Sequence, residues 1–406
     1  MSAPSALRSR RLSSVALLAL TFAVGFNLRA AVLGVPPVLS SVRGELHLSY
    51  SQVGLLGGIP ILAFGVTAIP AARLVRRLGG WLVVVAGLGL AAAGELLRVV
   101  PLQPVALFFG TAIMGVGIAA TQPGLPVLVQ AWFRGRVQSS SVTLTLGITV
   151  GELVAASLTG SALLPAVGSW QGTMVFWGLL GLLCAVAWAG FAPRADAGRT
   201  SDRTSRWLPL VRPSRVWAVY VCFAGQSLVF FSANTWIPLS APGGSHSAAA
   251  TLALAALNGV MVPVDVVLVF WPRQFATRWE FYLASGLVVL LGCLAWIWWG
   301  STLPWLGPAL IGAGVATNFA GLLAYPPLVA PPQQVAQLTS VMLSVGYGGA
   351  FLGPLLGGVA VDLGGGRLSP FIPITLAAAV MMVVSPAVPR RLPRRLAIGG
   401  GGLSVG

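Results

Sequence analysis

The sequence predicts an all-α membrane protein of twelve transmembrane helices, and three observations support this fold class. Of the 406 residues, 56% are hydrophobic and only 8% are charged, whereas about a quarter of the residues in a soluble domain are charged. The apolar residues gather in twelve runs, each long enough to cross a bilayer as a helix of about 20 residues. Arginines stand in short clusters on alternate connections between these runs. A soluble globular protein is therefore excluded.

The twelve runs follow one another with short connections. Many contain glycine or proline, which transmembrane helices tolerate because neighbouring groups satisfy the freed backbone. The first run continues past Arg29 and further spans follow it, so we expect an uncleaved helix and not a signal peptide. The runs cover residues 13–38, 51–74, 81–100, 104–129, 139–164, 171–192, 216–239, 248–270, 281–299, 303–328, 335–360 and 370–388.

The arginines predict the orientation of the helices. If the N-terminus is cytoplasmic, 20 of the 24 arginines lie on the cytoplasmic side, and only Arg43, Arg98 and Arg367 lie on the opposite side. This bias is typical of cytoplasmic loops, and it predicts that the N and C termini are both inside a multi-pass protein of the cytoplasmic membrane. The clusters do not line one face beside aromatic residues, so the net charge of +16 does not indicate nucleic-acid binding.

A long polar stretch in the middle of the chain divides the runs into six and six. It predicts an N-terminal six-helix bundle over residues 1–192 and a cytoplasmic linker over 193–215. The second six-helix bundle then covers 216–390, and a cytoplasmic tail covers 391–406. Two similar bundles joined in this way are typical of secondary transporters built from repeats.

Four spans carry short motifs that resemble one family. They are Asn27-Leu28-Arg29-Ala30-Ala31 with Val35-Pro36-Pro37-Val38-Leu39, then Gly117 to Pro126, then Gln226-Ser227-Leu228 with Trp236-Ile237-Pro238, and finally Ser344-Val345-Gly346-Tyr347 with Gly353-Pro354-Leu355-Leu356-Gly357. Together they resemble the cyanate and nitroimidazole transporter branch of the major facilitator superfamily. The resemblance implies the major facilitator fold and a secondary transporter that works by alternating access.

The chain departs from the pattern of that branch at several positions. Gln122 replaces the usual Asn of the fourth span, and Gln130 stands where a basic residue is usual. The Trp-Arg pair of the sixth span is Trp170-Gln171, and Leu343 replaces a Gln. These departures concern the choice of solute more than the scaffold.

Two charged residues in the spans are the first candidates for function, because ionisable groups in a membrane usually face the bundle interior. Arg29 offers a fixed fork of donors to a planar anion or nitro-like group, and Glu152 could carry a coupling proton. Both lie at comparable depth in their helices. Arg29 could therefore anchor the solute, pair with Glu152, or do both.

Three further charged groups admit a structural alternative. Glu95 and Arg98 stand three residues apart on one face of a helix, which favours an ion pair over a role in proton coupling. Asp265 lies close to the cytoplasmic end of the eighth span, where a contact with Arg273 or Arg278 is favoured over solute contact.

Uncharged polar and aromatic residues complete the candidate solute site. Amides can hydrogen-bond a solute of either polarity, or they can bond neighbouring helices. Two aromatic rings could stack on a planar solute. The candidates are Asn27, Gln122, Gln226, Asn234, Asn318, Trp236 and Tyr347.

The sequence favours a transporter over an enzyme. It contains no H-E-x-x-H, G-x-S-x-G or Walker motif, and the three cysteines have no partners at metal-ligand spacing. We therefore expect no cofactor, no metal and a monomeric chain. The predicted function is transport of a small anionic or planar polar solute, coupled to protons. The alternative is a proton-antiport exporter of drugs or secondary metabolites.

Overall fold

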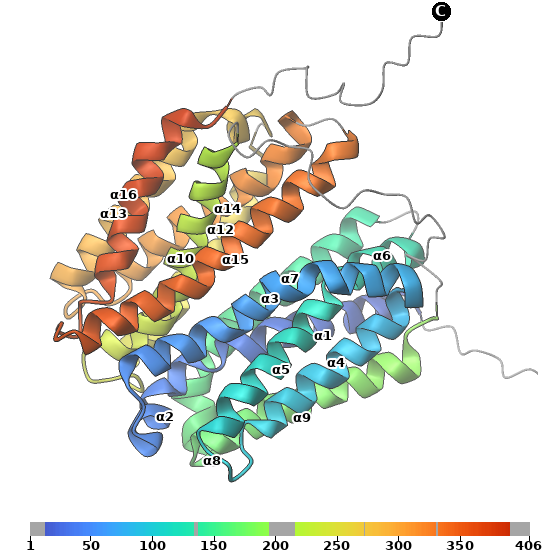
Figure 1. The fold of residues 1–406 in the computed structure, drawn as a ribbon, viewed down its shortest axis with the longest axis horizontal. Coiled ribbons are helices and arrows are strands. Elements are labelled where there is room, and N and C mark those ends of the chain that lie inside the picture. Colours follow the sequence, from blue (N-terminus) through green and yellow to red (C-terminus); the bar gives the residue numbers. More distant parts are fainter. Residues whose placement is uncertain (1–12, 134–136, 195–215, 272, 330–331, 390–406) are drawn as a thin grey trace, which may run out of the picture. The chain divides into compact units, whose positions relative to one another are not determined.

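The computed structural model describes residues 13–133, 137–194, 216–271, 273–329 and 332–389. Every regular element within these ranges is a helix (Figure 1). Eleven helical segments of the described chain are long and apolar enough to cross a membrane, and Phe371–Ala387 is a shorter apolar helix. The all-α membrane fold predicted from the sequence is confirmed. The predicted linker, beyond Arg194, and the predicted tail lie outside the described residues.

The helical elements follow the predicted runs closely, with breaks inside some of them. In chain order they are α1 (Ser14–Leu33), η1 (Pro36–Val38), α2 (Leu39–Leu46), α3 (Tyr50–Leu78), α4 (Gly80–Leu97), α5 (Val105–Thr121), α6 (Gly124–Trp132), α7 (Val137–Leu158), η2 (Thr159–Leu163), α8 (Leu164–Val167), α9 (Trp170–Phe191), α10 (Trp217–Ser240), α11 (Ala248–Gly259), α12 (Met261–Val269), η4 (Arg273–Thr277), α13 (Trp279–Trp299), α14 (Leu306–Val329), α15 (Pro332–Asp362), α16 (Phe371–Val384) and η5 (Ser385–Ala387).

Contacts group the chain into two compact units. Unit 1 comprises Met1–Val32, Thr67–Glu152 and Met174–Ser201, and unit 2 comprises Leu33–Val66, Leu153–Thr173 and Asp202–Gly406. The boundaries of these units fall inside α1, α3, α7 and α9.

Small residues set the packing of α4 on α5 in unit 1, where the two helices lie side by side (Figure 1). A Cβ atom added at Gly94 would lie 2.3 Å from the backbone nitrogen of Met114, and one added at Gly117 would lie 2.3 Å from that of Ala91. Only glycine permits this approach of the two backbones. Such contacts drive association of membrane helices, because lipid tails are as apolar as the side chains.

Helix α10 is the centre of unit 2. It packs against α11, α14, α15 and α16 (Figure 1), and most of its residues are buried. The buried core that α10 forms with its neighbours includes Phe223 of α10 itself, Tyr282 and Tyr325. A helix that is surrounded on most sides by protein holds its polar side chains away from lipid, which makes α10 a scaffold for buried amides.

The first half of α3 also belongs to unit 2 and packs on α15. A Cβ atom at Gly54 would lie 2.2 Å from the carbonyl oxygen of Pro354. At the end of this contact Asp362 accepts hydrogen bonds from the backbone N–H groups of Tyr50 (3.0 Å) and Ser51 (2.7 Å). The carboxylate thereby caps the first turn of α3, where N–H groups have no partner within the helix.

Two of the predicted spans are broken helices. The fourth span is interrupted between Thr121 and Gly124, around Pro123, and the eighth is interrupted at Val260, three residues before Pro263. Proline has no N–H and therefore removes a helical hydrogen bond. Each span as a whole is apolar enough to cross a membrane, so the apolar runs alone predicted continuous helices.

Candidate solute-binding site

Helices α1 and α7 approach each other at backbone distance within unit 1. A Cβ atom at Gly147 would lie 2.3 Å from the carbonyl oxygen of Phe22, and one at Gly151 would lie 2.3 Å from that of Phe26. The two glycines stand four residues apart in α7, in the small-xxx-small spacing that lets membrane helices pack closely. This G-x-x-x-G spacing stands in the fifth predicted span and was not among the motifs identified from the sequence.

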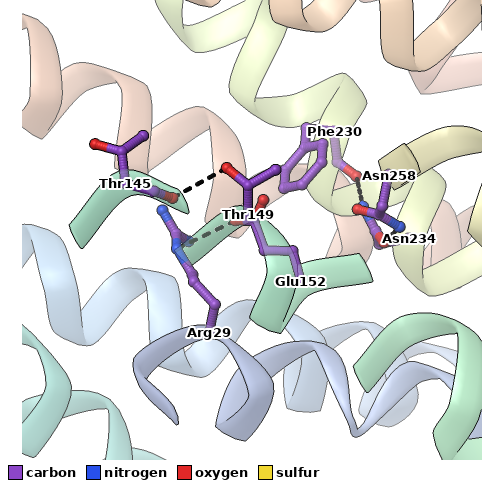
Figure 2. A network of polar contacts seen from close by, with 7 residues as sticks. All are labelled: Arg29, Thr145, Thr149, Glu152, Phe230, Asn234 and Asn258. Atoms are coloured by element: carbon purple, nitrogen blue, oxygen red, sulfur yellow. Dashed lines mark hydrogen bonds and ion pairs between the residues drawn. The ribbon is translucent and has the colours of Figure 1, made fainter. Parts of the chain in front are cut away.

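This packing places the residues that follow the contact opposite each other. Arg29 lies one turn beyond Phe26 in α1, and Glu152 follows Gly151 in α7. The Arg29 Nε atom lies 3.2 Å from Glu152 Oε1 (Figure 2). The two side chains that the sequence placed at comparable depth therefore form an ion pair.

The two partners of the ion pair differ in exposure. Glu152 engages the Nε side of the Arg29 guanidinium. The Arg29 side chain is 23% exposed, whereas that of Glu152 is 8% exposed. The carboxylate is therefore the more deeply buried partner, and the arginine side chain keeps a part of its surface exposed.

Asn27, although close to Arg29 in sequence, faces another helix. It is buried, and its side-chain amide is the nearest neighbour of Gly181 in α9. Its Nδ2 atom has no hydrogen-bond partner among the described residues. Asn27 therefore lies in the contact of α1 with α9, whereas Arg29 lies in the contact of α1 with α7.

Glu95 and Arg98 form a second buried charged cluster in unit 1, at the end of α4. Arg98 donates from Nη1 to the Met174 sulfur (3.4 Å) and from Nη2 to the Met114 sulfur. Glu95 is 2% exposed, and its Oε2 atom has no partner among the described residues. The cluster contains both charges, but the hydrogen bonds of the guanidinium go to thioethers.

The buried amides of unit 2 lie around α10. Asn258 donates from Nδ2 to Oδ1 of Asn234 (3.0 Å), as Figure 2 shows from close by. Asn318 in α14 donates to the hydroxyl of Ser285 (2.8 Å). All three amides are at most 1% exposed. Asn258 was not among the candidates from the sequence, although it stands in an apolar run as Asn234 and Asn318 do.

The remaining predicted candidates of α10 and α15 lie in helix packing. The indole N–H of Trp236 donates to the carbonyl oxygen of Pro354 (3.1 Å), and its ring lies beside that of Tyr50. Gln226 is buried and accepts from the Ser227 hydroxyl (3.0 Å). The half-buried ring of Tyr347 meets Phe64 edge-on at 5.7 Å between centroids.

The last two candidates lie at helix breaks or beyond them. Gln122 is half-buried at the interruption between α5 and α6, and Asp265 is half-buried in α12. Of the two arginines expected near Asp265, Arg278 lies 3.8 Å from Glu280, and the side chain of Arg273 lies outside the described residues.

Two polar clusters in unit 2 were not predicted from the sequence. Glu45 accepts from Trp170 Nε1 and from Gln171 Nε2, both at 2.7 Å. The Gln171 that departs from the family pattern therefore contacts a carboxylate. His246 bonds the hydroxyls of Ser40 (3.2 Å) and Ser41 (3.0 Å), and burial lowers the pKa of its imidazole. Sequence separations above 120 residues concealed both clusters.

Comparison with known proteins agrees with this architecture. The chain is 28% identical to the 2-nitroimidazole transporter of Escherichia coli (strain K12), over 91% of this chain and 94% of that protein. It is 29% identical to the uncharacterized transporter YycB of Bacillus subtilis (strain 168), over 90% of each chain. It is 24% identical to the cyanate transport protein CynX of Escherichia coli (strain K12), over 89% of this chain and 94% of that protein.

Solved structures and a family model extend these similarities. A bacterial homolog of the human lysosomal transporter Spinster, in its inward-facing and unoccupied conformation, matches with a TM-score of 0.73. The sequences are 16% identical, and the match covers 94% of this chain and 98% of that chain. Residues 15–354 match the model of the Major Facilitator Superfamily. The chain belongs to the Major Facilitator Superfamily and is a multi-pass membrane transporter of that family.

Proposed function

We propose that this protein moves a small anionic or planar polar solute across the cytoplasmic membrane by alternating access, and that protons drive the movement. The observation that carries the proposal is the ion pair of Arg29 and Glu152, at 3.2 Å, with a partly exposed guanidinium. The relatives named for 2-nitroimidazole and cyanate support the solute class. In this proposal each half of the chain contributes six transmembrane helices, and both termini are cytoplasmic.

The ion pair supplies a route for coupling. While Glu152 is ionised, its charge compensates the guanidinium of Arg29. When Glu152 takes up a proton, the compensation is lost and the guanidinium attracts an anion more strongly. A proton and an anion therefore bind with positive linkage, and each raises the affinity for the other by the same factor. This linkage favours movement of the two in the same direction.

The test uses purified protein in liposomes, with cyanate and 2-nitroimidazole as probes. Arg29→Gln should abolish binding of cyanate while the protein remains folded. Glu152→Gln should bind cyanate with an affinity that no longer changes with pH. This variant should exchange internal for external solute but should not accumulate it against a gradient when a pH gradient is applied.

A matched control is the exposed pair of Arg278 and Glu280, at 3.8 Å. Arg278→Gln and Glu280→Gln should leave binding and accumulation unchanged. If Glu152→Gln still accumulates solute in response to the pH gradient, the coupling role is wrong. Undiminished binding by Arg29→Gln would remove the anchoring role.

A further inference from the structure

The amides of Asn234 in α10 and Asn258 in α11 form a chain of hydrogen bonds inside unit 2. Asn258 Nδ2 donates to Asn234 Oδ1 (3.0 Å) and to the carbonyl oxygen of Leu254 (3.0 Å). Asn234 Nδ2 donates in turn to the carbonyl oxygen of Phe230 (3.0 Å). Each amide is 1% exposed (Figure 2).

Backbone carbonyls fix the direction of this chain. A carbonyl oxygen only accepts hydrogen bonds, so the side-chain atom that faces Leu254 or Phe230 has to be the amide nitrogen. Turning either amide over would set oxygen against oxygen, which excludes the alternative assignment. The chain therefore ends on the oxygen of Asn258, and this Oδ1 atom has no hydrogen-bond partner among the described residues.

A second acceptor stands beside this oxygen in sequence. Helix α11 ends at Gly259 and α12 begins at Met261. Pro263 has no N–H, so the carbonyl of Gly259 lacks the donor that a continuous helix would supply. Asn258 is the middle residue of the candidate span Ala248–Leu268. The backbone keeps helical dihedral angles at Val260, so the proline leaves this carbonyl as an acceptor within a largely helical span.

We infer that the Asn258 side-chain oxygen accepts a hydrogen bond from the transported solute, and that the solute therefore carries an N–H or O–H donor. This inference rests on the proposed function and narrows its solute class. A buried acceptor without a partner is unfavourable. A site built around such an acceptor discriminates against an otherwise identical solute that lacks the donor. The preferred solute is thus a planar heterocycle or acid with a donor, in preference to a bare anion.

The test compares two probes that differ in one donor. 2-Nitroimidazole has a ring N–H, and its 1-methyl derivative has none. Wild-type protein should bind the parent compound about 10-fold more tightly or better, because the methylated compound leaves the Asn258 oxygen unpaired. In Asn258→Ala the ratio of the two affinities should fall to about one, because the variant binds 2-nitroimidazole more weakly and the 1-methyl derivative about as before. Cyanate, an anion without a donor, serves as a third probe.

Thr235→Val is the matched control. Thr235 is buried in the same helix as Asn234, and its hydroxyl bonds only the carbonyl oxygen of Phe231 among the described residues (2.9 Å). This variant loses a buried polar group close to the amides and should keep the wild-type ratio. A purely structural role of Asn258 would weaken both imidazoles together and leave their ratio unchanged.

The outcomes separate this inference from the proposed function. If wild-type protein binds the two imidazoles equally, the inference is overturned while the proposed function stands, and this measurement needs no variant. An unchanged ratio in Asn258→Ala also overturns it. If wild-type protein binds neither imidazole nor cyanate, the proposed solute class is wrong, and the inference that rests on it is overturned as well.

Discussion

Arg98 brings a guanidinium into unit 1 that is only 1% exposed and that donates to two methionine sulfurs. Thioethers are weak acceptors, so they compensate only part of the cost of removing the cation from water. Glu95, three residues earlier on the same helix, supplies the opposite charge. A buried pair of charges adds little stability when it is complete, but removal of one partner leaves the other uncompensated.

Arg98→Met should therefore lower the free energy of unfolding in detergent by about 3–5 kcal/mol, because it isolates the Glu95 carboxylate. The double variant Glu95→Leu/Arg98→Met removes both charges and should recover most of that loss. Thermal unfolding of the two single variants and the double variant measures the coupling. If the losses simply add, the two charges do not compensate each other, and the predicted ion pair is wrong.

At the scale of the element, glycines determine how closely helices approach. Gly147 and Gly151 hold α7 against α1, and this contact brings Glu152 opposite Arg29. The ion pair thus depends on residues that carry no charge. A side chain at Gly151 would force the two helices apart.

Gly151→Ala should cost about 1–3 kcal/mol, because its Cβ would lie 2.3 Å from the carbonyl oxygen of Phe26. The larger separation should also weaken binding of cyanate by disturbing Arg29. Gly89→Ala is the control, since nothing lies within 4 Å of a Cβ at that position of α4. This control should be neutral or slightly stabilising. Thermal unfolding in detergent compares the two, and equal effects would show that the close contact does not limit packing.

The elements differ in how far the sequence could predict them. The apolar runs predicted the helical segments within a few residues. A helix that crosses hydrocarbon needs a continuous apolar stretch, and each stretch can be recognised from its own residues. The breaks before Gly124 and at Val260 were missed, since proline in a membrane run is compatible with a straight or an interrupted helix. The pairing of Arg29 with Glu152 could be predicted, because both residues lie at comparable depth in their helices. Asn258 was overlooked, although an amide in an apolar run is the same signal that identified Asn234 and Asn318. Its hydrogen bond to Asn234 could not be predicted, because the two residues lie on different helices, 24 residues apart.

For the whole molecule, the arginine clusters predict an orientation that can be measured. The three native cysteines are all buried, at positions Cys184, Cys222 and Cys293. A thiol reagent should therefore label a single introduced, exposed cysteine with little labelling of the native ones. Leu78 follows the second span and Leu102 follows the third, and their side chains are 49% and 71% exposed. If both termini are inside, the first of these connections is cytoplasmic and the second faces the outside.

In intact cells a membrane-impermeant maleimide should label Leu102→Cys and should label Leu78→Cys only after permeabilisation. Wild-type protein, treated in the same way, is the control for the native cysteines. The reverse pattern would place both termini outside. Labelling of both positions in intact cells would contradict the predicted alternation of the connections.

The hydrogen bonds from Tyr50 and Ser51 to Asp362 also set an order for biosynthesis. They join residues 312 and 311 positions apart. At about 5–20 residues per second, a ribosome needs roughly 15–60 s to reach Asp362 after it has made Tyr50. During that interval the first turn of α3 has no carboxylate cap, and water, lipid headgroups or the insertion machinery have to satisfy its N–H groups. A nascent chain that is halted before the end of α15 therefore lacks the cap on the first turn of α3. The difference from the finished protein lies far along the chain from the point of arrest.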